Sequence, residues 1–439
     1  MRRTATIPNC ARLARSPFHP AQRKWRSLPC FGRKADGSTG APTGTFVATR
    51  LKVLLNITGT MGHPAHHVAI KGITFRDTAQ TYFDPHGLPS GGDWALQPQG
   101  AVTIVGSENV SIDGCLFTRL DGNGVFAGGY HRNLSLTDNE FAFIGASAMT
   151  AWGDTSSALN GNGTLTVPGG HKVGPDGRGG EQPRGTVVDG NIGHELGLWQ
   201  KQSSLWFQAV TAQTTVRNNI FFNGPRAALN FNDQFGGGDD VRGNLLLNSV
   251  RESGDHGPWN SWSRVPYITD VRTPGVASIV PATRAIHRNL IIANYFSFGA
   301  IDTDDGSSYF DVHDNFLAYG EHGLKSDFGG HNMVWHGNVL AYVGNCIHPP
   351  YRGEYLGYND GFVRNACVFR ESYQSDCAAV AGWTVHNNTV SSATGDVRVC
   401  GMNFSAWQSQ GHDRGTVVRR WPTDAELVAL GEAVLNMGA

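Results

Sequence analysis

The sequence is poor in charged residues and has no long apolar run. Only 16% of its 439 residues are Asp, Glu, Lys or Arg, and the formal net charge is −1. Without an excess of positive charge, the chain lacks the electrostatic attraction on which nucleic-acid binding depends. It also contains no run of about eighteen apolar residues, the length that a membrane-spanning helix requires. We therefore expect no nucleic-acid partner and no membrane span, and we expect a monomer.

Cysteine is scarce as well, with seven residues in the chain. Four of them lie close to the C-terminal end, at Cys346, Cys367, Cys377 and Cys400, and they allow one or two disulfides. Cys115 falls at an inward position of an expected strand, where a thiol behaves as a small buried apolar side chain. The sequence thus predicts disulfides in the C-terminal part and no reactive thiol at Cys115.

Acidic residues are absent from the first 34 residues, which carry nine Lys or Arg. The apolar residues there are too scattered to form the hydrophobic region of a signal peptide. We expect residues 1–45 to be a disordered basic segment. Six Asn-x-Ser/Thr glycosylation motifs nevertheless favour an extracellular or secretory-pathway location, at Asn56, Asn109, Asn133, Asn162, Asn387 and Asn403.

Glycine is abundant, with 57 residues, and one short phrase recurs along the chain. The phrase is an apolar residue, two mostly polar residues and Asn, and it ends at Asn191, Asn219, Asn244, Asn289, Asn315, Asn338 and Asn388. When degenerate copies are included, most steps between copies are 22 to 28 residues, which is the length of one coil of a three-sheet parallel β-helix. The period predicts an all-β chain whose residues 46–400 form a right-handed, single-stranded parallel β-helix of about ten or more coils.

Three steps of this repeat are too long for one coil, and they predict long loops at residues 76–100, 153–184 and 251–284. Residues 401–439 are expected to be a C-terminal tail that contains a helix at about 423–435. Thr423 and Glu426 have the spacing of a capping box, which marks the start of such a helix. We expect this helix to cover the open edge of the last coil.

The Asn positions are expected to be structural, because Asn tolerates the left-handed backbone of a tight corner and stacked Asn side chains bond to one another. His287, His313 and His336 recur at one place in the phrase, two residues before the Asn. Arg217, Arg242, Lys71 and Thr137 occupy the same place in other copies. We therefore interpret this column as a solvated face rather than as a metal site.

One strand of each coil begins about fourteen residues before the Asn, and alternation there separates inward from outward side chains. The residues expected to point outward are Trp152, Trp206, Gln208, Asn230, Asn232, Asp302, Asp304, Lys325 and Asp327. Indole rings stack on sugar faces, and amides and carboxylates bind sugar hydroxyls. This wall is therefore interpreted as a carbohydrate-binding groove, with Trp94, Trp259 and Trp262 expected nearby.

The carboxylates have spacings that suit glycoside hydrolysis. On consecutive coils Asp304 and Asp327 are expected about 5 Å apart at Cα, and Asp302 lies about 8 Å from Asp327 diagonally. The nearer pair suits a retaining mechanism and the farther pair an inverting one. We take these three Asp residues as candidate catalytic residues, with Lys325 countering their charge.

The candidate substrate-binding residues are Trp152, Trp206, Gln208, Asn230, Asn232, Glu252, Asp255, His256 and Lys325. Glu252, Asp255 and His256 enter this set because the segment 251–284 connects coils that carry the groove. The run Asp302-Thr-Asp-Asp-Gly306 also has the look of a weak calcium loop, or of a plain acidic turn. No cofactor other than this calcium ion is expected.

Short motifs resemble those of β-helix hydrolases. The segment Leu324–Gly330 resembles the Ser-Asp-x-Gly-Gly step of enzymes like glycoside hydrolase family 141, and Leu120–Gly128 is similar to their glycine-flanked strand. Phe404–Asp413 resembles a tail of secreted carbohydrate-active β-helices. As an architecture the resemblance covers about residues 46–420, and it extends to β-helix proteins of algae and marine invertebrates. It implies action on fucose- or xylose-containing glycans, with Asp327 as a catalytic group.

Two other functions remain open at this point. A polysaccharide lyase on the same scaffold would use Lys325 as its base, together with calcium. A non-catalytic glycan-binding or cell-wall protein would bind the polymer without turnover. The products distinguish the first two, since a lyase leaves an unsaturated uronate and a hydrolase does not.

Overall fold

The computed structural model describes residues 48–89, 94–153, 181–262, 282–294, 297–304, 307–325, 330–348, 360–375 and 383–436, with short backbone stretches at 165–166 and 172–173. The described residues from Thr49 onward belong to one compact unit. The expected disordered segment 1–45 lies outside the described residues. No helix among the described residues is long and apolar enough to cross a membrane.

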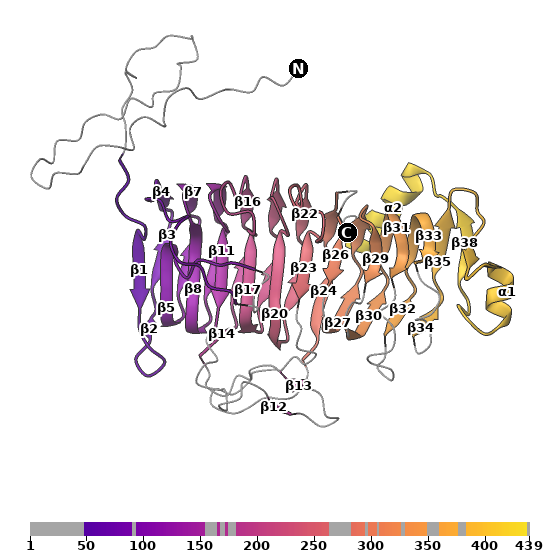
Figure 1. The fold of residues 1–439 in the computed structure, drawn as a ribbon, viewed down its shortest axis with the longest axis horizontal. Helices are drawn as coiled ribbons and strands as arrows, with labels where there is room; N and C mark the ends of the chain where they lie inside the picture. The colour runs from indigo at the N-terminus through magenta and orange to yellow at the C-terminus, as the bar shows by residue number, and fades with distance from the viewer. Residues whose placement is uncertain are drawn as a thin grey trace, which may run out of the picture. The chain divides into compact units, whose positions relative to one another are not determined.

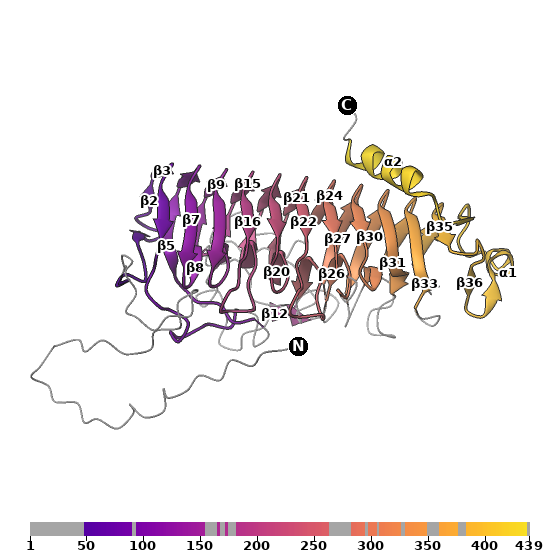
Figure 2. The same cartoon turned by 90° about the horizontal axis from the view of Figure 1, so that it is seen from above.

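The chain visits three sheets in turn and returns to the first, and almost every strand pairs in parallel with the strand one coil away (Figures 1 and 2). We call these sheets A, B and C. Sheet A contains β1 (Leu55–Thr58), β5 (Gly100–Glu108), β8 (Asn123–Arg132), β11 (Met149–Trp152), β17 (Trp206–Ala212), β20 (Leu229–Gly237), β23 (Trp259–Trp262) and β26 (Ile301–Thr303), with β2 (Ala65–His66) and β14 (Pro183–Arg184) beside them.

Sheet B contains β3 (Ala69–Lys71), β6 (Ser111–Asp113), β9 (Ser135–Thr137), β15 (Val187–Asp189), β18 (Thr215–Arg217), β21 (Asp240–Arg242), β24 (Arg284–His287), β27 (Ser308–His313), β30 (His331–His336), β32 (Gly361–Val363) and β34 (Thr384–His386). Sheet C contains β4 (Thr74–Arg76), β7 (Leu116–Leu120), β10 (Glu140–Ile144), β16 (Ile192–His194), β19 (Ile220–Phe222), β22 (Leu245–Leu247), β25 (Leu290–Ile292), β28 (Phe316–Ala318), β31 (Val339–His348), β33 (Ala366–Gln374), β35 (Thr389–Ser392) and β38 (Val417–Arg420), and β29 (His322–Lys325) pairs with β31. The chain is a parallel β-helix, as the repeat predicts.

Two short antiparallel pairs lie outside these sheets. One is β12 (Leu165–Thr166) with β13 (Lys172–Val173), and the other is β36 (Arg398–Val399) with β37 (Met402–Asn403). The segment 251–284, expected to be a loop, is a strand in part, because Trp259–Trp262 form β23 of sheet A. The segment expected to be a loop therefore contributes one more strand to sheet A.

The core is a column of apolar side chains that the three sheets enclose. The apolar residue that opens each repeated phrase points into it, as Val188, Val216 and Ile286 do in sheet B, and all three are fully buried. Apolar burial of this kind contributes about 25 cal/mol per Å². Cys115 is a free, buried cysteine in the same cluster, in line with its expected place.

The repeated Asn residues form a buried ladder along the corner between sheets B and C. The ladder runs through Asn139, Asn191, Asn219, Asn244, Asn289, Asn315, Asn338, Asn365 and Asn388, and each Nδ2 donates to the Oδ1 of the next. The left-handed backbone lies one residue earlier than expected, for example at Asn218, Arg288 and Asp314, with φ of 56°, 53° and 53°. The repeat therefore selects Asn for its side-chain amide rather than for its backbone.

Replacing Asn289 with Ala is expected to destabilise the protein by about 3 kcal/mol, because it leaves buried polar groups without partners at about 1–3 kcal/mol each. Asn289 Oδ1 accepts from the backbone N–H and the Nδ2 of Asn244, and its Nδ2 donates to the Val241 carbonyl. Urea unfolding measures the change. The control, Asn56→Ala at an exposed position, should shift stability by less than about 0.5 kcal/mol. Equal effects at the two positions would contradict the structural role of the ladder.

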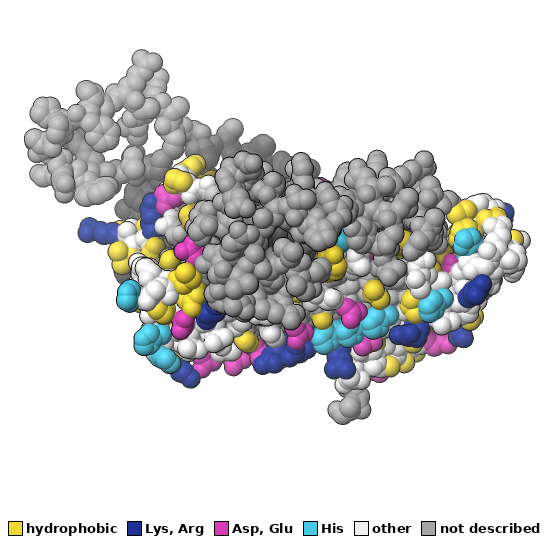
Figure 3. All heavy atoms as spheres, turned by 90° about the horizontal axis from the view of Figure 1, so that it is seen from below, with side chains coloured by type: hydrophobic (Ala, Val, Ile, Leu, Met, Phe, Trp, Pro, Cys, Tyr) yellow, Lys and Arg dark blue, Asp and Glu magenta, His cyan; other side chains and the backbone are white. Residues whose placement is uncertain are grey.

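The outer side of sheet B carries the histidine column. The rings of His287 and His313 stack at 4.7 Å and those of His313 and His336 at 4.9 Å between centroids. Asp240 and Asp311 bond to the first and last of these imidazoles at 3.0 and 2.9 Å. Figure 3 shows histidine side chains beside basic and acidic ones on the face seen from below. The column is an outer face whose imidazoles stack on one another and are hydrogen-bonded to carboxylates.

Two helices follow the last coils. The first, α1 (Phe404–Ser409), buries Phe404 and Trp407 against the core. The second, α2 (Asp424–Leu435), starts with the predicted capping box between Thr423 and Glu426. The expectation that it covers the open edge of the last coil is wrong, since α2 lies on the outer side of sheet C over Phe316 (Figure 2). Its buried Leu427 joins the apolar residues of that side, which gives the helix its position.

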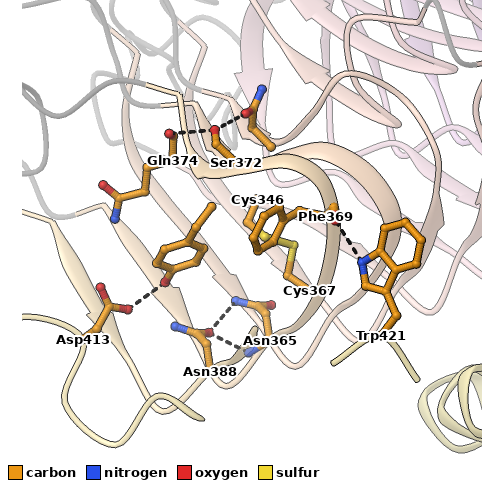
Figure 4. Close-up of a disulfide and its surroundings, with 11 residues drawn as sticks. Cys346, Asn365, Cys367, Phe369, Ser372, Gln374, Asn388, Asp413 and Trp421 are labelled. Carbon is orange, nitrogen blue, oxygen red and sulfur yellow. Dashed lines mark hydrogen bonds between the residues drawn. A yellow bond between two sulfur atoms is a disulfide. The ribbon is translucent and has the colours of Figure 1, made fainter. Parts of the chain in front are cut away.

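The predicted disulfides form in the C-terminal part. Cys346 of β31 and Cys367 of β33 are bonded, so the bridge links two neighbouring coils (Figure 4). Cys400 is also disulfide-bonded. Cys377 lies outside the described residues.

The carboxyl group of Asp360, just before β32, makes the stability of the folded chain depend on pH. It is buried, its Oδ1 accepts from the Met333 N–H at 2.7 Å, and burial raises the pKa of its carboxyl from 3.8 to about 7. Between those pH values the folded chain binds one proton more than the unfolded chain, so stability falls as pH rises through the window. At about 1.4 kcal/mol per pKa unit, the full loss at pH 8 is about 4 kcal/mol.

Replacing Asp360 with Asn is therefore expected to stabilise the protein at pH 8 and to have little effect at pH 4. The gain at pH 8 should be about 2 kcal/mol, less than the full pKa cost, because the new amide must itself leave water. Urea unfolding of both proteins at the two pH values measures the difference. A stability change that is the same at pH 4 and pH 8 would show that the Asp360 carboxyl does not titrate as described.

Candidate active site

The outer side of sheet A carries one continuous row of side chains in register. The row consists of Thr103, Phe126, Thr150, Phe207, Asn230, Asn260 and Asp302. A bridge between Gly299 and His322 extends the sheet by one coil and sets Lys325 beside Asp302, and Lys325 is in register with His348 of β31. Along the row, apolar side chains and hydroxyls give way to amides and then to charges. The charged end of the row is the candidate active site.

Trp206 and Gln208, predicted on the outer wall, point inward instead. Trp206 is in register with Met149 and Leu229, belongs to the core cluster, and donates through Nε1 to Gln208 Oε1 at 3.0 Å. The prediction assumes that the inward-pointing residue stands fourteen residues before the Asn. In this coil the inward residue is Trp206, which stands only thirteen residues before Asn219. Buried in the core, these two side chains have no access to a glycan on the outer wall.

The stretch that begins with Trp206 is one residue shorter than the equivalent stretch of β8. Six residues separate Trp206 from Ala212, whereas seven separate Val125 from Arg132, and these pairs occupy the same register positions. Each extra or missing residue turns every later side chain to the opposite face. Phe207, not Trp206, therefore lies on the outer wall.

Lys325 sits between two carboxylates. Its Nζ lies 2.7 Å from Asp302 Oδ1 and 3.1 Å from Asp304 Oδ1. Asp302 and Lys325 are buried, whereas the side chain of Asp304 is 21% exposed. The ammonium group also lies 4.3 Å from the ring centroid of Phe298, a contact that favours a cation. Of the two carboxylates, only Asp304 is open to a substrate.

Asn260 and Asn230 support the buried carboxylate from the preceding coils. In the amide orientation that pairs donors with acceptors, Asn260 Nδ2 donates to Asp302 Oδ2 over 3.0 Å. Its Oδ1 then faces the Asn230 carboxamide at 3.1 Å. Asp302 is thus held by an amide on one oxygen and by Lys325 on the other, so both of its oxygens are occupied by the chain itself.

His256 completes the cluster from the other side. One ligand atom each of His256, Asp302 and Asp304 lies within 4.8 Å of the others. Burial, helped by the charges of Arg226 and Lys325, lowers the pKa of His256 to about 3, so its imidazole is neutral at ordinary pH. Arg226 Nη2 lies 3.5 Å from His256 Nδ1. The site therefore combines two carboxylates, one ammonium group and one neutral imidazole.

The calcium ion considered from the sequence does not fit this cluster. Calcium takes six to eight oxygen ligands. Here the Lys325 ammonium group already pairs with both Asp302 and Asp304, and the third potential ligand among the described residues, His256, offers nitrogen. The carboxylates of Asp302 and Asp304 instead suit the ammonium group of Lys325, which they bind.

The segment 76–100 covers the N-terminal part of the outer wall (Figure 1). Trp94 stacks on Phe207 at 5.2 Å between ring centroids, and a Cβ atom on Gly87 would meet the ring of Trp152. Trp152 thus points outward, as predicted, but it is half-buried beneath the chain's own loop. Open wall is therefore expected only towards the charged end of the row.

The other predicted residues divide into four groups. Asn230 and Asn232 lie on the wall, and both are buried. Glu252 and Asp255 are exposed in the turn before His256, where Glu252 pairs with Lys201 at 2.9 Å. Asp327 and the side chain of Trp262 lie outside the described residues. The expectation for Trp259 is wrong, because its ring is fully buried in the core.

Several residues of the site were not among the predicted ones. Asn260 occupies the wall position of Asn230 one coil later, and the similar runs Leu-Asn-Phe-Asn and Trp-Asn-Ser-Trp are the signal that would have found it. Phe298 and Arg226 come from connecting segments, for which the repeat gives no alignment.

Comparison with known proteins gives few matches. No known protein family matches the sequence, and no curated protein matches it. Among solved structures, one described as "Glycoside hydrolase" is similar, with 15% sequence identity and a TM-score of 0.48, over 66% of this chain and 50% of that chain. The chain thus spans about half the length of that hydrolase.

Proposed function

We propose that the protein is a glycoside hydrolase that acts on a polysaccharide or oligosaccharide at the charged end of the sheet A wall. The observation that carries the proposal is the contrast between Asp302 and Asp304. Lys325 holds both carboxylates, but only Asp304, with its side chain 21% exposed, has access to solvent. An accessible carboxylate that a buried lysine holds in place has the properties of a glycosidase nucleophile or base.

The roles of the carboxylates follow from their surroundings. Asp304 is the proposed catalytic carboxylate. Asp302, considered from the sequence as a catalytic base, is buried with both oxygens occupied, so we assign it a positioning role for Lys325. Asp327 follows Lys325 by two residues, as Asp304 follows Asp302. This matching position, together with the resemblance of its motif, supports Asp327 as the partner carboxylate.

Hydrolysis by this pair needs one group that protonates the leaving oxygen and one that attacks the sugar or activates water. Asp304 takes the second role because it is the accessible carboxylate of the two and Lys325 holds it in place. Asp327 then takes the role of general acid. The neutral imidazole of His256 is suited to bonding a sugar hydroxyl beside them.

The lyase alternative has less support. Lys325 would have to act as a neutral base, yet carboxylates at 2.7 and 3.1 Å stabilise its protonated form. The calcium ion that such lyases use does not fit the described donors either. The substrate class, fucose- or xylose-containing glycans, rests on the sequence resemblance alone.

Digestion of a glycan panel, with products read by mass spectrometry, tests the function. The panel includes fucose- and xylose-containing polymers and polyuronates. A hydrolase adds one water to each pair of products, whereas a lyase adds none and leaves an unsaturated uronate that absorbs in the ultraviolet. Products without added water, or binding without any product, would reject the hydrolase assignment.

A further inference from the structure

A second cavity lies on another side of the β-helix, between α2 and the outer side of sheet C. Its volume is about 520 Å³, within the range of about 300–1,000 Å³ that small-molecule sites occupy. The floor consists of short side chains in register on the last coils, with Ala366 beside Thr389 and Val368 beside Ser391. These short side chains leave room beneath the helix.

The floor carries two hydroxyl groups without partners. Ser391 is 5% exposed and lines the cavity, and its Oγ has no hydrogen-bond partner among the residues that the structure describes. Within the same described ranges, the hydroxyl of the half-buried Thr389 has none either. Neither oxygen is among the fully buried atoms without a partner, so both hydroxyls are open to the cavity. The pair is therefore available to bond with the hydroxyl groups of a ligand.

The charges around the cavity favour an anion. Arg419 and Arg420 both line it, against a single carboxylate, that of Glu426. That carboxylate is already engaged, because Glu426 Oε2 accepts from the backbone N–H and the hydroxyl of Thr423, both at 2.8 Å. Arg420 donates from Nε to the Thr394 carbonyl at 3.1 Å. Arg419 is left with an exposed guanidinium group, which is suited to pairing with a carboxylate.

Trp421 provides an aromatic wall. Its indole is 38% exposed, and its Nε1 donates to the Phe369 carbonyl at 3.1 Å. Figure 4 shows this bond beside the Cys346–Cys367 disulfide. The edge of Tyr342 supports the ring at 5.4 Å between centroids. The indole is thus fixed from two sides, as a platform for the apolar face of a sugar should be.

We infer that this cavity is a second glycan-binding site, one that takes a uronic acid unit. The carboxylate of the sugar pairs with Arg419, its ring hydroxyls bond to Ser391 and Thr389, and its apolar face lies against Trp421. A fatty acid would also satisfy the arginine but would leave both hydroxyls unpaired. Because the cavity lies on sheet C and Asp304 follows a strand of sheet A, the site binds without turnover and does not depend on the proposed hydrolysis.

Calorimetry with a galacturonic acid trisaccharide tests this inference, with the neutral galactose trisaccharide as comparison. The full chain carrying Asp304→Asn is used so that the ligand is not consumed. Adding Arg419→Ala should raise the Kd for the acidic trisaccharide at least about tenfold, or about 1.4 kcal/mol. Adding Ser391→Ala should raise it about fivefold, because one hydrogen bond is lost.

The matched control is Arg414→Ala, which removes an exposed guanidinium from the same last coil on the sheet B side, and it should leave the Kd unchanged within about twofold. Equal binding of the acidic and neutral trisaccharides would overturn the inference. So would unchanged binding in Arg419→Ala, or displacement of the sugar by decanoate. Activity of the parent chain is measured separately, so that failure of this site and failure of the hydrolase proposal give different results.

Discussion

Replacing Asp304 with Asn is expected to reduce glycan turnover at least about a hundredfold while unfolding stays nearly unchanged. The amide keeps the shape of the side chain, but it neither attacks a sugar nor takes a proton from water, and it carries no charge to stabilise the transition state. Stability should hold because Asp304 is partly exposed and its side chain bonds mainly to Lys325, which keeps its closer contact with Asp302. Turnover on the substrate found in the panel, and thermal unfolding, measure the two effects.

The control for this variant is Asp311→Asn. Asp311 is 41% exposed on sheet B, where it pairs with His336, so its loss should leave turnover within about twofold of the parent. Azide rescue of Asp304→Ala adds a mechanistic readout, since a glycosyl azide product forms only if Asp304 is the nucleophile. Full activity of Asp304→Asn would show that Asp304 is not a catalytic residue, and the run Asp302–Gly306 would then be interpreted as a plain acidic turn.

The architecture was predictable because the Asn ladder imposes its period on the sequence. The coils from Asn139 to Asn388 present an amide at the same corner, since a missing one leaves the neighbouring coil with unpaired buried groups. That requirement fixes Asn219 and Asn244 in identity and, where no loop is inserted between coils, in spacing as well. The position of α2 was not predictable, because the apolar residues on the outer side of sheet C, such as Phe316, follow no signal that distinguishes them from core positions.

The candidate site was predictable only where coil length is regular. Ile301 stands fourteen residues before Asn315, so the count correctly turned Asp302 and Asp304 outward. Trp206 breaks the count by one residue because the stretch after it is one residue shorter than the stretch after Val125, and no residue type in the sequence marks that difference. Burial was the second limit. An outward direction does not imply exposure, since Asp302 and Asn230 both point outward and are nevertheless fully buried.

Replacing Lys325 with Met is expected to destabilise the protein by about 3–5 kcal/mol, because it leaves a buried carboxylate without its cation. Met has nearly the length of Lys and keeps the packing against Phe298, so the loss reports on charge rather than on volume. The exposed pair of Lys71 and Asp113, 3.1 Å apart with the lysine side chain 68% exposed, supplies the control. Lys71→Met should cost less than about 1 kcal/mol.

The double variant Lys325→Met with Asp302→Asn isolates the charge interaction. Once Asp302 is neutral, no buried charge remains uncompensated, and most of the lost stability should return. Turnover should not return, because Asp304 still lacks the ammonium group that holds it in place. Urea unfolding and turnover of the parent, the two single variants and the double variant complete the cycle. Additive losses, or a Lys325→Met cost no larger than that of Lys71→Met, would show that Lys325 does not compensate a buried Asp302.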